Sequence, residues 1–297
     1  HTADSMTLDV KSEDFVISEQ DSLWAGQSLH SLYAKAATPY DWHEELFAYA
    51  RSLGLVIFSS PFDNHAVDFL DSLDVPCFKI ASFELTDTPL IAHVASKGKP
   101  MIMSTGMATL AEIEQAVATA KDNGCPDIIL LKCTSTYPAE PTNTNLQTIP
   151  NMSQAFHCQV GLSDHTRGIG AAVAAVALGA TVIEKHFVLD RKAGGVDAAF
   201  SLEPQELKLL VEESQRAWQA LGTVKYGGTM AETKSKQYRR SIYICDDVKA
   251  GTVLSDKNMR IVRPAFGLEP KHWESVIGRK VKSDLPKGHA LRWQDIE

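Results

Sequence analysis

Two histidines stand at the ends of successive apolar segments in the middle of the chain. His165 closes the motif SDH, and His186 closes the motif EKH one segment later. If the two segments are neighbouring parallel strands, they lie about 4.8 Å apart, and both imidazoles can bind one divalent cation. Water or a substrate oxygen would then fill the remaining positions, which suits a Lewis acid. On spacing alone, two structural histidines are the alternative.

Hydroxyl groups and a lysine also recur where apolar segments end. A phosphate group is bound by O–H and N–H donors and by positive charge, and these residues supply all three. Each residue alone could be a surface side chain or a helix cap, but their recurrence at four segment ends predicts one anion site. The members are Ser60, Lys79, Ser82, Ser104, Thr105 and Ser163.

Two loops add further polar candidates. The segment Lys192–Asp197 reads KAGGVD, and its two glycines indicate a flexible loop that could bring Asp197 beside the histidines. Arg263 precedes Pro264, which stiffens the loop, and a loop arginine is a good clamp for an anion or a hydroxyl. A plain turn and a solvated arginine are the alternatives.

Six apolar segments, separated by amphipathic helical patterns, must position these side chains. Each segment is continuously apolar, as expected of strands buried on both faces, and they recur at the period of βα units. The expected strands are Leu55–Ser60, Cys77–Ser82, Pro100–Thr105, Asp127–Thr134, Gln159–Asp164 and Thr181–Phe187. The expected helices are Trp42–Leu53, Asn64–Leu73, Thr88–Lys97, Leu110–Asn123, Ile169–Leu178 and Glu206–Leu221, with a capping box at Thr109 and Glu112.

The position of the polar residues favours a TIM-type (β/α) barrel over an open doubly wound sheet. They follow the strands at the carboxyl ends, where barrels build their active sites. No GxGxxG motif follows a strand, so the fingerprint of a dinucleotide-binding sheet is missing. A barrel needs eight strands and residues 1–40 are mostly polar, so the sequence predicts an α/β barrel that lacks its first βα units.

An acidic main body and a basic C-terminal part divide the chain. Residues 235–297 carry 13 Lys and Arg against 8 Asp and Glu, a net charge of +5, and the remaining residues carry 16 against 29, a net charge of −13. We expect a catalytic barrel over residues 1–222, a linker over residues 223–234 and a small β-rich domain over residues 235–297. The short strands expected there are Ser241–Cys245, Val253-Leu254 and Ile261-Val262.

The composition argues against several classes of partner. The basic C-terminal residues form no stripe with aromatic residues, so nucleic acid is not expected as a partner. No apolar run reaches the length of a membrane span, and no signal segment opens the chain, so no membrane partner is expected. The five cysteines are odd in number and lack CxxC spacing, which favours a reducing cytoplasm over a disulfide framework.

Taken together, these segments resemble the sialic-acid synthase family. The similarity covers nearly the whole chain, and the C-terminal part resembles the antifreeze-like (SAF) domain of that family. Leu23–Leu46 resembles the pseudaminic acid synthase branch more than the N-acetylneuraminate branch. The matching blocks, in family order, are Ser59–Asp63 (SSPFD), Lys79–Glu84 (KIASFE), Ser104–Met107 (STGM), Cys133–Pro138 (CTSTYP), Gly161–Thr166 (GLSDHT), Glu184–Phe187 (EKHF) and Arg263-Pro264.

The resemblance implies a transferase that forms a carbon–carbon bond. Carbon C3 of phosphoenolpyruvate would attack the aldehyde of an open-chain 2,4-diacetamido-2,4,6-trideoxy hexose. Water would add at C2, and phosphate would leave by C–O cleavage to give pseudaminic acid. An N-acetylneuraminate or legionaminate synthase, a metal-dependent aldolase that uses pyruvate, and a non-catalytic sugar-binding protein are the alternatives.

The resemblance also implies roles for single residues. His165 and His186 would hold a divalent metal, manganese first and magnesium or cobalt otherwise, with Glu184 beside it. Tyr137 and Asp197 would contact the sugar or hold metal-bound water. The residues that match phosphoenolpyruvate-binding positions are Lys79, Ser82, Ser60, Ser104 and Ser163.

Three further features refine what the resemblance to the family implies. Ser135 stands where sialic-acid synthases commonly carry Asn, which fits a different sugar. Arg263 of one subunit would clamp the sugar over the other subunit's barrel, which implies a domain-swapped homodimer. The family's N-terminal catalytic Glu and its Lys-x-Gln-Thr block have no counterpart in the sequence, which opens at His1, so we expect a truncated form.

Overall fold

The computed structural model describes residues 1–18 and 24–297. Leu23, the first residue of the segment that resembles the pseudaminic branch, lies outside the described residues. The chain divides into two compact units, His1–Gly222 and Thr223–Glu297, and each unit has a hydrophobic core of its own.

A parallel sheet of five strands forms the centre of the first unit. The strand order is β1-β2-β3-β4-β5, so every strand pairs with the next one along the chain. A parallel sheet in sequential order, with a helix after each strand, is the repeating architecture of a (β/α) barrel. The structure therefore confirms a partial barrel. The strands are β1 (Phe78–Ile80), β2 (Met101–Ser104), β3 (Ile128–Cys133), β4 (Gln159–Asp164) and β5 (Val182–Lys185).

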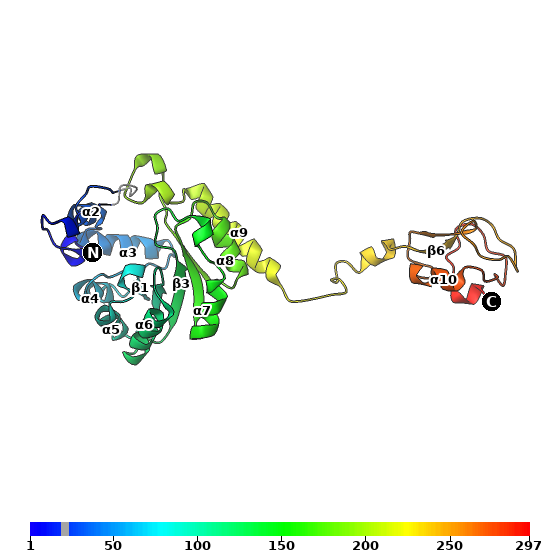
Figure 1. Ribbon diagram of the computed structural model, residues 1–297, viewed down its shortest axis with the longest axis horizontal. Helices are drawn as coiled ribbons and strands as arrows, with labels where there is room; N and C mark the ends of the chain where they lie inside the picture. The colour runs from blue at the N-terminus through cyan, green and yellow to red at the C-terminus, as the bar shows by residue number, and fades with distance from the viewer. Residues whose placement is uncertain (19–23) are drawn as a thin grey trace. The chain divides into compact units, whose positions relative to one another are not determined.

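Helices flank this sheet, as Figure 1 shows, and their apolar faces pack against the strands. The N-terminal helices are α1 (Ala3–Met6), α2 (Leu29–Ala36) and α3 (His43–Ser52). The helices that alternate with strands are α4 (Asn64–Ser72), α5 (Thr88–Ala95), α6 (Leu110–Asp122), α7 (Thr148–Phe156) and α8 (Gly170–Ala177), followed by α9 (Pro204–Leu221).

Side-chain caps fix the first turns of several helices. The predicted capping box of α6 is present: Glu112 N donates to Thr109 Oγ1 at 3.3 Å, and Thr109 N donates to Glu112 Oε2 at 2.7 Å. Asp63 caps α4 by accepting from Ala66 N at 2.7 Å. Each such cap stabilises its helix by about 1 kcal/mol.

The segment Leu55–Ser60, predicted to be a strand, is not one. One hydrogen bond, from Lys79 N to Ser59 O at 3.4 Å, joins it to β1. Leu55 and Val56 are 60% and 75% exposed. The apolar run indicated burial on both faces, but no described strand pairs with its other side, so a ladder does not form.

Helix α7 (Thr148–Phe156) was not predicted. A proline within a helix is normally unfavourable because it lacks the backbone donor, and α7 contains Pro150. In the structure Pro150 lies in the first turn, where the backbone N–H has no partner within the helix, so its missing donor costs little.

The second unit is small and rich in extended chain. Strand β6 (Ser241–Ile244) pairs with β7 (Met259–Val262) in an antiparallel ladder, and α10 (Trp273–Val276) follows. Two of the three predicted strands are present. Val253 forms only an isolated bridge with Lys280, so the third prediction was too generous. Across residues 1–18 and 24–297, no helix has the length and apolar character to cross a membrane.

Candidate active site

One cavity of about 730 Å³ lies at the carboxyl ends of the strands. Eleven of the thirteen residues singled out from the sequence line it, because the ends of parallel strands meet at one edge of a sheet. They are Ser60, Lys79, Ser82, Ser104, Ser135, Tyr137, Ser163, His165, Glu184, His186 and Asp197. Arg263 belongs to the second unit. Thr105 is not among the residues that line this cavity, and its Oγ1 donates to Leu131 O at 3.1 Å.

Lys79 supplies positive charge at the floor of the cavity. It is only 6% exposed, and its Nζ donates to Ser104 Oγ and to Ile80 O, each at 2.8 Å. Glu184 Oε2 lies 3.7 Å from the same nitrogen. Burial lowers the pKa of Lys79, and the nearby Glu184 carboxylate opposes that shift. A buried ammonium with one weak ion pair has capacity left for an anionic ligand.

Gly106 allows two hydroxyl groups to converge beside this lysine. Its N–H donates to Ser82 Oγ at 3.1 Å. A Cβ at this position would lie 2.1 Å from Ser135 Oγ and 2.7 Å from Ser82 Oγ, so any other residue would push the two serines apart. The glycine of the STGM motif thus keeps the floor open for small hydroxyl side chains.

The last residues of β4 and β5 are locked in register on both faces. Ser163 pairs with Glu184 on the cavity side, and Ser163 Oγ donates to Glu184 Oε1 at 2.5 Å. The next pair, Asp164 and Lys185, forms an ion pair of 2.8 Å whose side chains are 0% and 3% exposed. Because neighbouring strand residues point to opposite faces, this buried pair lies behind the cavity and fixes the strand ends that carry both histidines.

His165 and His186 lie next to each other, with ring centroids 5.2 Å apart. His165 Nδ1 is 2.9 Å from Thr134 O, and His186 Nδ1 is 3.5 Å from Asp197 Oδ2. Metal-binding histidines usually give one ring N–H to a carbonyl or carboxylate and ligate through the other nitrogen. The donor set therefore fits a divalent cation held by two imidazoles.

The described residues contain no group of three or more His, Cys, Asp and Glu placed to hold a metal ion. Any further ligands at this pair of histidines would have to be water or substrate oxygen. This is the open coordination that a Lewis-acid role requires.

Cys133, at the end of β3, was not among the predicted site residues although it lines the cavity. Its Sγ lies 3.8 Å from His165 Nδ1 and 3.7 Å from Ser135 Oγ. Burial by itself would raise the pKa of this thiol, but hydrogen bonds with His165 and with Ser82 outweigh burial and lower the pKa to about 7. The feature of the sequence that could have identified Cys133 is its position at the end of a predicted strand.

Tyr137 stands over the histidines. Its ring centroid is 4.5 Å from that of His165. Burial and the neighbouring negative charges raise the pKa of its hydroxyl to about 12. The hydroxyl therefore stays protonated at neutral pH and can donate a hydrogen bond.

Glu84 is a further cavity residue that the sequence reasoning did not select. Its Oε2 is buried without a hydrogen-bond partner among the described residues, and burial raises the pKa of the carboxyl group. The residue as a whole is only partly buried and lines the cavity, so its carboxyl group can meet a ligand N–H or O–H there. The signal in the sequence was the acid two positions after Ser82 in the KIASFE block.

An apolar wall from the N-terminal residues faces the polar floor. The sequence indicated only that residues 1–40 are mostly polar and do not supply the missing strands. The residues from this part that line the cavity include Met6, Ile17, Trp24, Leu29, Leu32 and Tyr33. The cavity is thus polar on the strand side and apolar on the side of α1 and α2.

Arg263 is exposed in the loop after β7. Ser241 organises that loop, because its Oγ donates to Pro264 O at 2.7 Å and accepts from Gly267 N at 3.0 Å. Considered within the second unit alone, the guanidinium of Arg263 is accessible to a ligand.

Known proteins match both units. The NeuB family matches residues 1–226, and the SAF domain matches residues 239–297. A pseudaminic acid synthase from Campylobacter jejuni is 41% identical over 100% of this chain and 86% of that protein. An N,N'-diacetyllegionaminic acid synthase from the same species is 39% identical over 84% of this chain and 76% of that protein.

A solved structure is also similar. The N-acetylneuraminic acid synthetase from Leptospira borgpetersenii, crystallised with citrate, superposes with a TM-score of 0.66 and is 33% identical. The match covers 70% of this chain and 72% of that chain.

Proposed function

Because the chain belongs to the NeuB family and carries a SAF domain, we propose that it is a pseudaminic acid synthase. It would condense phosphoenolpyruvate with an open-chain 2,4-diacetamido-2,4,6-trideoxy hexose and release phosphate. The relatives support a condensing transferase of the sialic-acid type. The observation that carries the proposal is the single cavity that joins a buried lysine, a set of serine hydroxyls and two adjacent histidines.

Phosphoenolpyruvate would bind at the polar floor. Lys79 would pair with an anionic oxygen, and the hydroxyls of Ser82 and Ser104 would donate to the phosphate. Ser60 and Ser163 stand on the same side of the cavity and would complete the set. A buried ammonium acts in a low-dielectric setting, where its attraction for phosphate exceeds the attraction that it would have in water.

The reaction balances with water as the only further reactant. Carbon C3 forms a bond to the aldehyde carbon, and the aldehyde oxygen becomes a hydroxyl after it gains a proton. Water adds at C2, and the bond from C2 to the phosphate oxygen breaks, which leaves a 2-keto acid and inorganic phosphate. A divalent cation held by His165 and His186, manganese first and magnesium or cobalt otherwise, would polarise the aldehyde.

Three side chains would manage protons and position the sugar. Glu184, which accepts from Ser163, can take a proton from the attacking water. The protonated Tyr137 can donate to the developing alkoxide or to a sugar hydroxyl. Asp197 would orient His186 and accept from a sugar hydroxyl. Glu84 lines the same cavity, and its carboxyl group can accept from an N–H or O–H of the sugar.

The apolar wall supports a sugar with methyl groups. Two acetamido methyls and a 6-deoxy carbon give such a sugar more apolar surface than N-acetylmannosamine has, and Leu29 and Leu32 lie where they can cover it. Ser135, which is shorter than the Asn that sialic-acid synthases commonly carry there, also lines the cavity. The match to a pseudaminic acid synthase over the whole chain points the same way.

We propose a domain-swapped homodimer in which Arg263 of one subunit clamps the sugar in the other subunit's barrel. The exposure of Arg263 supports this role, because an accessible guanidinium can bind hydroxyl or carboxylate groups. The five cysteines are free thiols, which fits a protein of the cytoplasm, the compartment that we propose.

Mass spectrometry of the products tests the proposed function. The full-length protein is incubated with phosphoenolpyruvate, Mn²⁺ and, separately, 2,4-diacetamido-2,4,6-trideoxyaltrose, its legionaminate-pathway stereoisomer or N-acetylmannosamine. We expect a nine-carbon keto acid and one phosphate per product with the altrose sugar. Preference for another sugar would assign that synthase instead. Condensation with pyruvate without phosphate would indicate an aldolase, and metal binding without any turnover would indicate a sugar-binding protein.

A further inference from the structure

A loop between β5 and α9 reaches into the cavity and returns. Its ends are joined, because Leu202 N donates to His186 O at 2.8 Å and Val188 N donates to Leu202 O at 2.9 Å. Between them the chain runs through Gly194 and Gly195, whose φ angles of 79° and 130° favour glycine. The loop over residues 189–201 therefore begins and ends beside His186.

This loop supplies two side chains to the histidine pair. Asp197 Oδ2 lies 3.5 Å from His186 Nδ1. Phe200 is only 2% exposed, and its ring centroid is 5.0 Å from that of His186 and 5.5 Å from that of Tyr137. The position of the loop thus decides how His186 is oriented.

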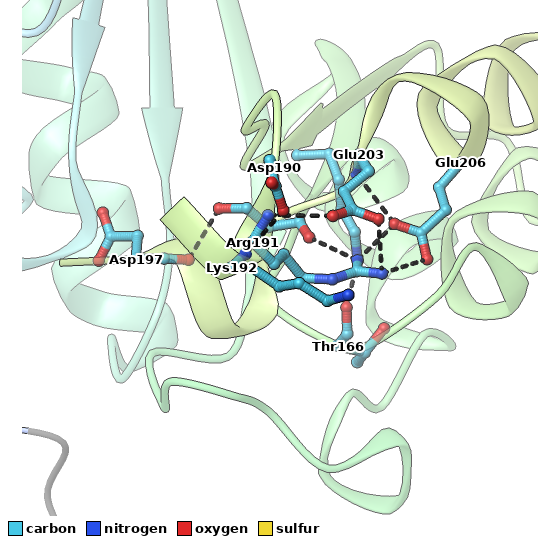
Figure 2. Close-up of polar contacts among 9 residues, drawn as sticks. Thr166, Asp190, Arg191, Lys192, Asp197, Glu203 and Glu206 are labelled. Carbon is cyan, nitrogen blue, oxygen red and sulfur yellow. Dashed lines mark hydrogen bonds and ion pairs between the residues drawn. The ribbon is translucent and has the colours of Figure 1, made fainter. Parts of the chain in front are cut away.

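Arg191 ties the loop to the start of α9, as Figure 2 shows. Both terminal nitrogens of its guanidinium contact the carboxylate of Glu206, one of them at 3.1 Å. Nη1 also donates to Ser201 O at 3.0 Å, and Nη2 lies 3.2 Å from Glu203 Oε2. The backbone N–H of Arg191 donates to Glu203 Oε1 at 3.0 Å. One side chain therefore joins the first turn of the loop, its last residue and the helix.

Hydrogen bonds through Ser201 connect the Arg191 side chain to Asp197. Ser201, whose carbonyl accepts from Arg191, donates through its hydroxyl to Asp197 O at 2.7 Å. The buried Phe200 directly precedes Ser201 in the chain. Arg191 itself is not among the residues that line the cavity, so it reaches the site only through the loop.

We propose that Arg191 is a positioning residue that holds Asp197 and Phe200 against His186. This inference rests on the proposed function, which puts His186 at the reacting centre. A planar guanidinium bound to a carboxylate through two nitrogens fixes direction as well as distance, and a lysine cannot reproduce that geometry. The Arg191 and Glu206 side chains are 37% and 36% exposed, so their ion pair adds little to global stability.

The test compares Arg191→Met with Arg191→Lys and with a matched control. Arg216 forms a similar ion pair with Glu213 on the same helix, remote from the loop in sequence, so Arg216→Met is the control. Hydrogen exchange of the amides of residues 190–201 is measured by mass spectrometry, together with kcat and the two KM values. Thermal unfolding shows whether each variant is folded.

We expect Arg191→Met to speed exchange in the loop and to lower kcat by about 10- to 100-fold, as displaced supporting groups do. The KM for phosphoenolpyruvate should change by less than about twofold, because the polar floor comes from other strands. Arg191→Lys should recover part of the loss. Arg216→Met should match the parent protein in every measurement.

Unchanged loop exchange in a folded Arg191→Met protein would overturn the proposal, and so would equal losses in Arg216→Met. An unchanged kcat despite faster exchange would also overturn it, because the loop would then not position the site. If the parent protein shows no turnover, the proposed function fails, and the exchange data alone decide whether Arg191 holds the loop.

Discussion

Replacing Glu84 by Gln should stabilise the protein and yet weaken its activity. Glu84 lines the cavity, and its Oε2 is buried without a hydrogen-bond partner among the described residues. Burial desolvates a charge in that position, and a backbone hydrogen bond and the charge of Lys79 offset this cost only in part. The glutamine side chain has nearly the same shape and removes only the charge.

The expected gain in the free energy of unfolding follows from the one Glu84 oxygen that lacks a hydrogen-bond partner among the described residues. A buried acceptor without a partner costs about 1–3 kcal/mol, and because Glu84 as a whole is only partly buried we take about 1 kcal/mol. For a unit of this size that corresponds to a rise of about 2–4 °C in the midpoint of thermal unfolding. The neutral amide keeps a smaller desolvation cost, which sets this figure as an upper bound.

The stability that the Gln variant gains over the parent should increase with pH. Burial raises the pKa of Glu84 above its usual value of 4.5, so the folded protein holds the carboxyl proton more tightly than the unfolded chain does. Stability of the parent protein is therefore lost as the pH rises through the raised folded pKa. Below the unfolded pKa both states are protonated, and the advantage of the Gln variant should vanish.

Thermal unfolding of the parent and of Glu84→Gln at about pH 7.5 and about pH 3.5 measures this difference. Glu114 on α6 is exposed, so Glu114→Gln serves as the control and should change neither stability nor kcat/KM. Loss of a charged hydrogen bond to the sugar should lower kcat/KM by about 10- to 100-fold in Glu84→Gln. A variant that is folded but less stable than the parent at the higher pH would refute the reasoning.

Three further variants test other parts of the site. In initial-rate assays, Lys79→Met should raise the KM for phosphoenolpyruvate by about 10- to 100-fold, because it removes a charged contact of about 1.5–3 kcal/mol. The KM for the sugar should stay nearly unchanged. Equal effects on both KM values would contradict a role of Lys79 in binding phosphate. Lys185→Met should lower the free energy of unfolding by about 3–5 kcal/mol in urea titrations, because Asp164 is left charged and buried; a loss below about 1 kcal/mol would count against the lock behind the histidines. Inactive His186→Ala and weak Arg263→Ala chains, once mixed and allowed to exchange subunits, should regain activity only if Arg263 acts on the partner's barrel, and no recovery would contradict the swapped dimer.

Much of the sheet could be predicted because buried parallel strands have a simple signature. The continuous apolar runs around Met101–Ser104 and Ile128–Cys133 are buried between helices, and their lengths were nearly right. Leu55–Ser60 has the same signature. A run of apolar residues indicates that a segment tends to be buried, but it does not show whether a neighbouring strand is present to pair with it. Helix α7 was not predicted, and it holds Pro150, a residue that disfavours helix interiors, in its first turn.

The polar half of the cavity was accessible from sequence for a topological reason. Once the strands are parallel, their carboxyl ends share one edge, so Ser104 and Ser163 must come close to each other. What the sequence could not provide depends on tertiary contacts. The sealed oxygen of Glu84 is a matter of burial, the apolar wall comes from residues far along the chain, and the Arg191 clamp joins two ends of a loop.

We propose that one cavity joins the two substrates and breaks the C–O bond of phosphoenolpyruvate. Phosphoenolpyruvate labelled with ¹⁸O at the oxygen between C2 and phosphorus tests it directly, with the full-length protein, Mn²⁺ and the 2,4-diacetamido-2,4,6-trideoxy sugar. We expect the released phosphate to carry the label and the nine-carbon acid to lack it. Unlabelled phosphate, or a product formed without release of phosphate, would contradict it.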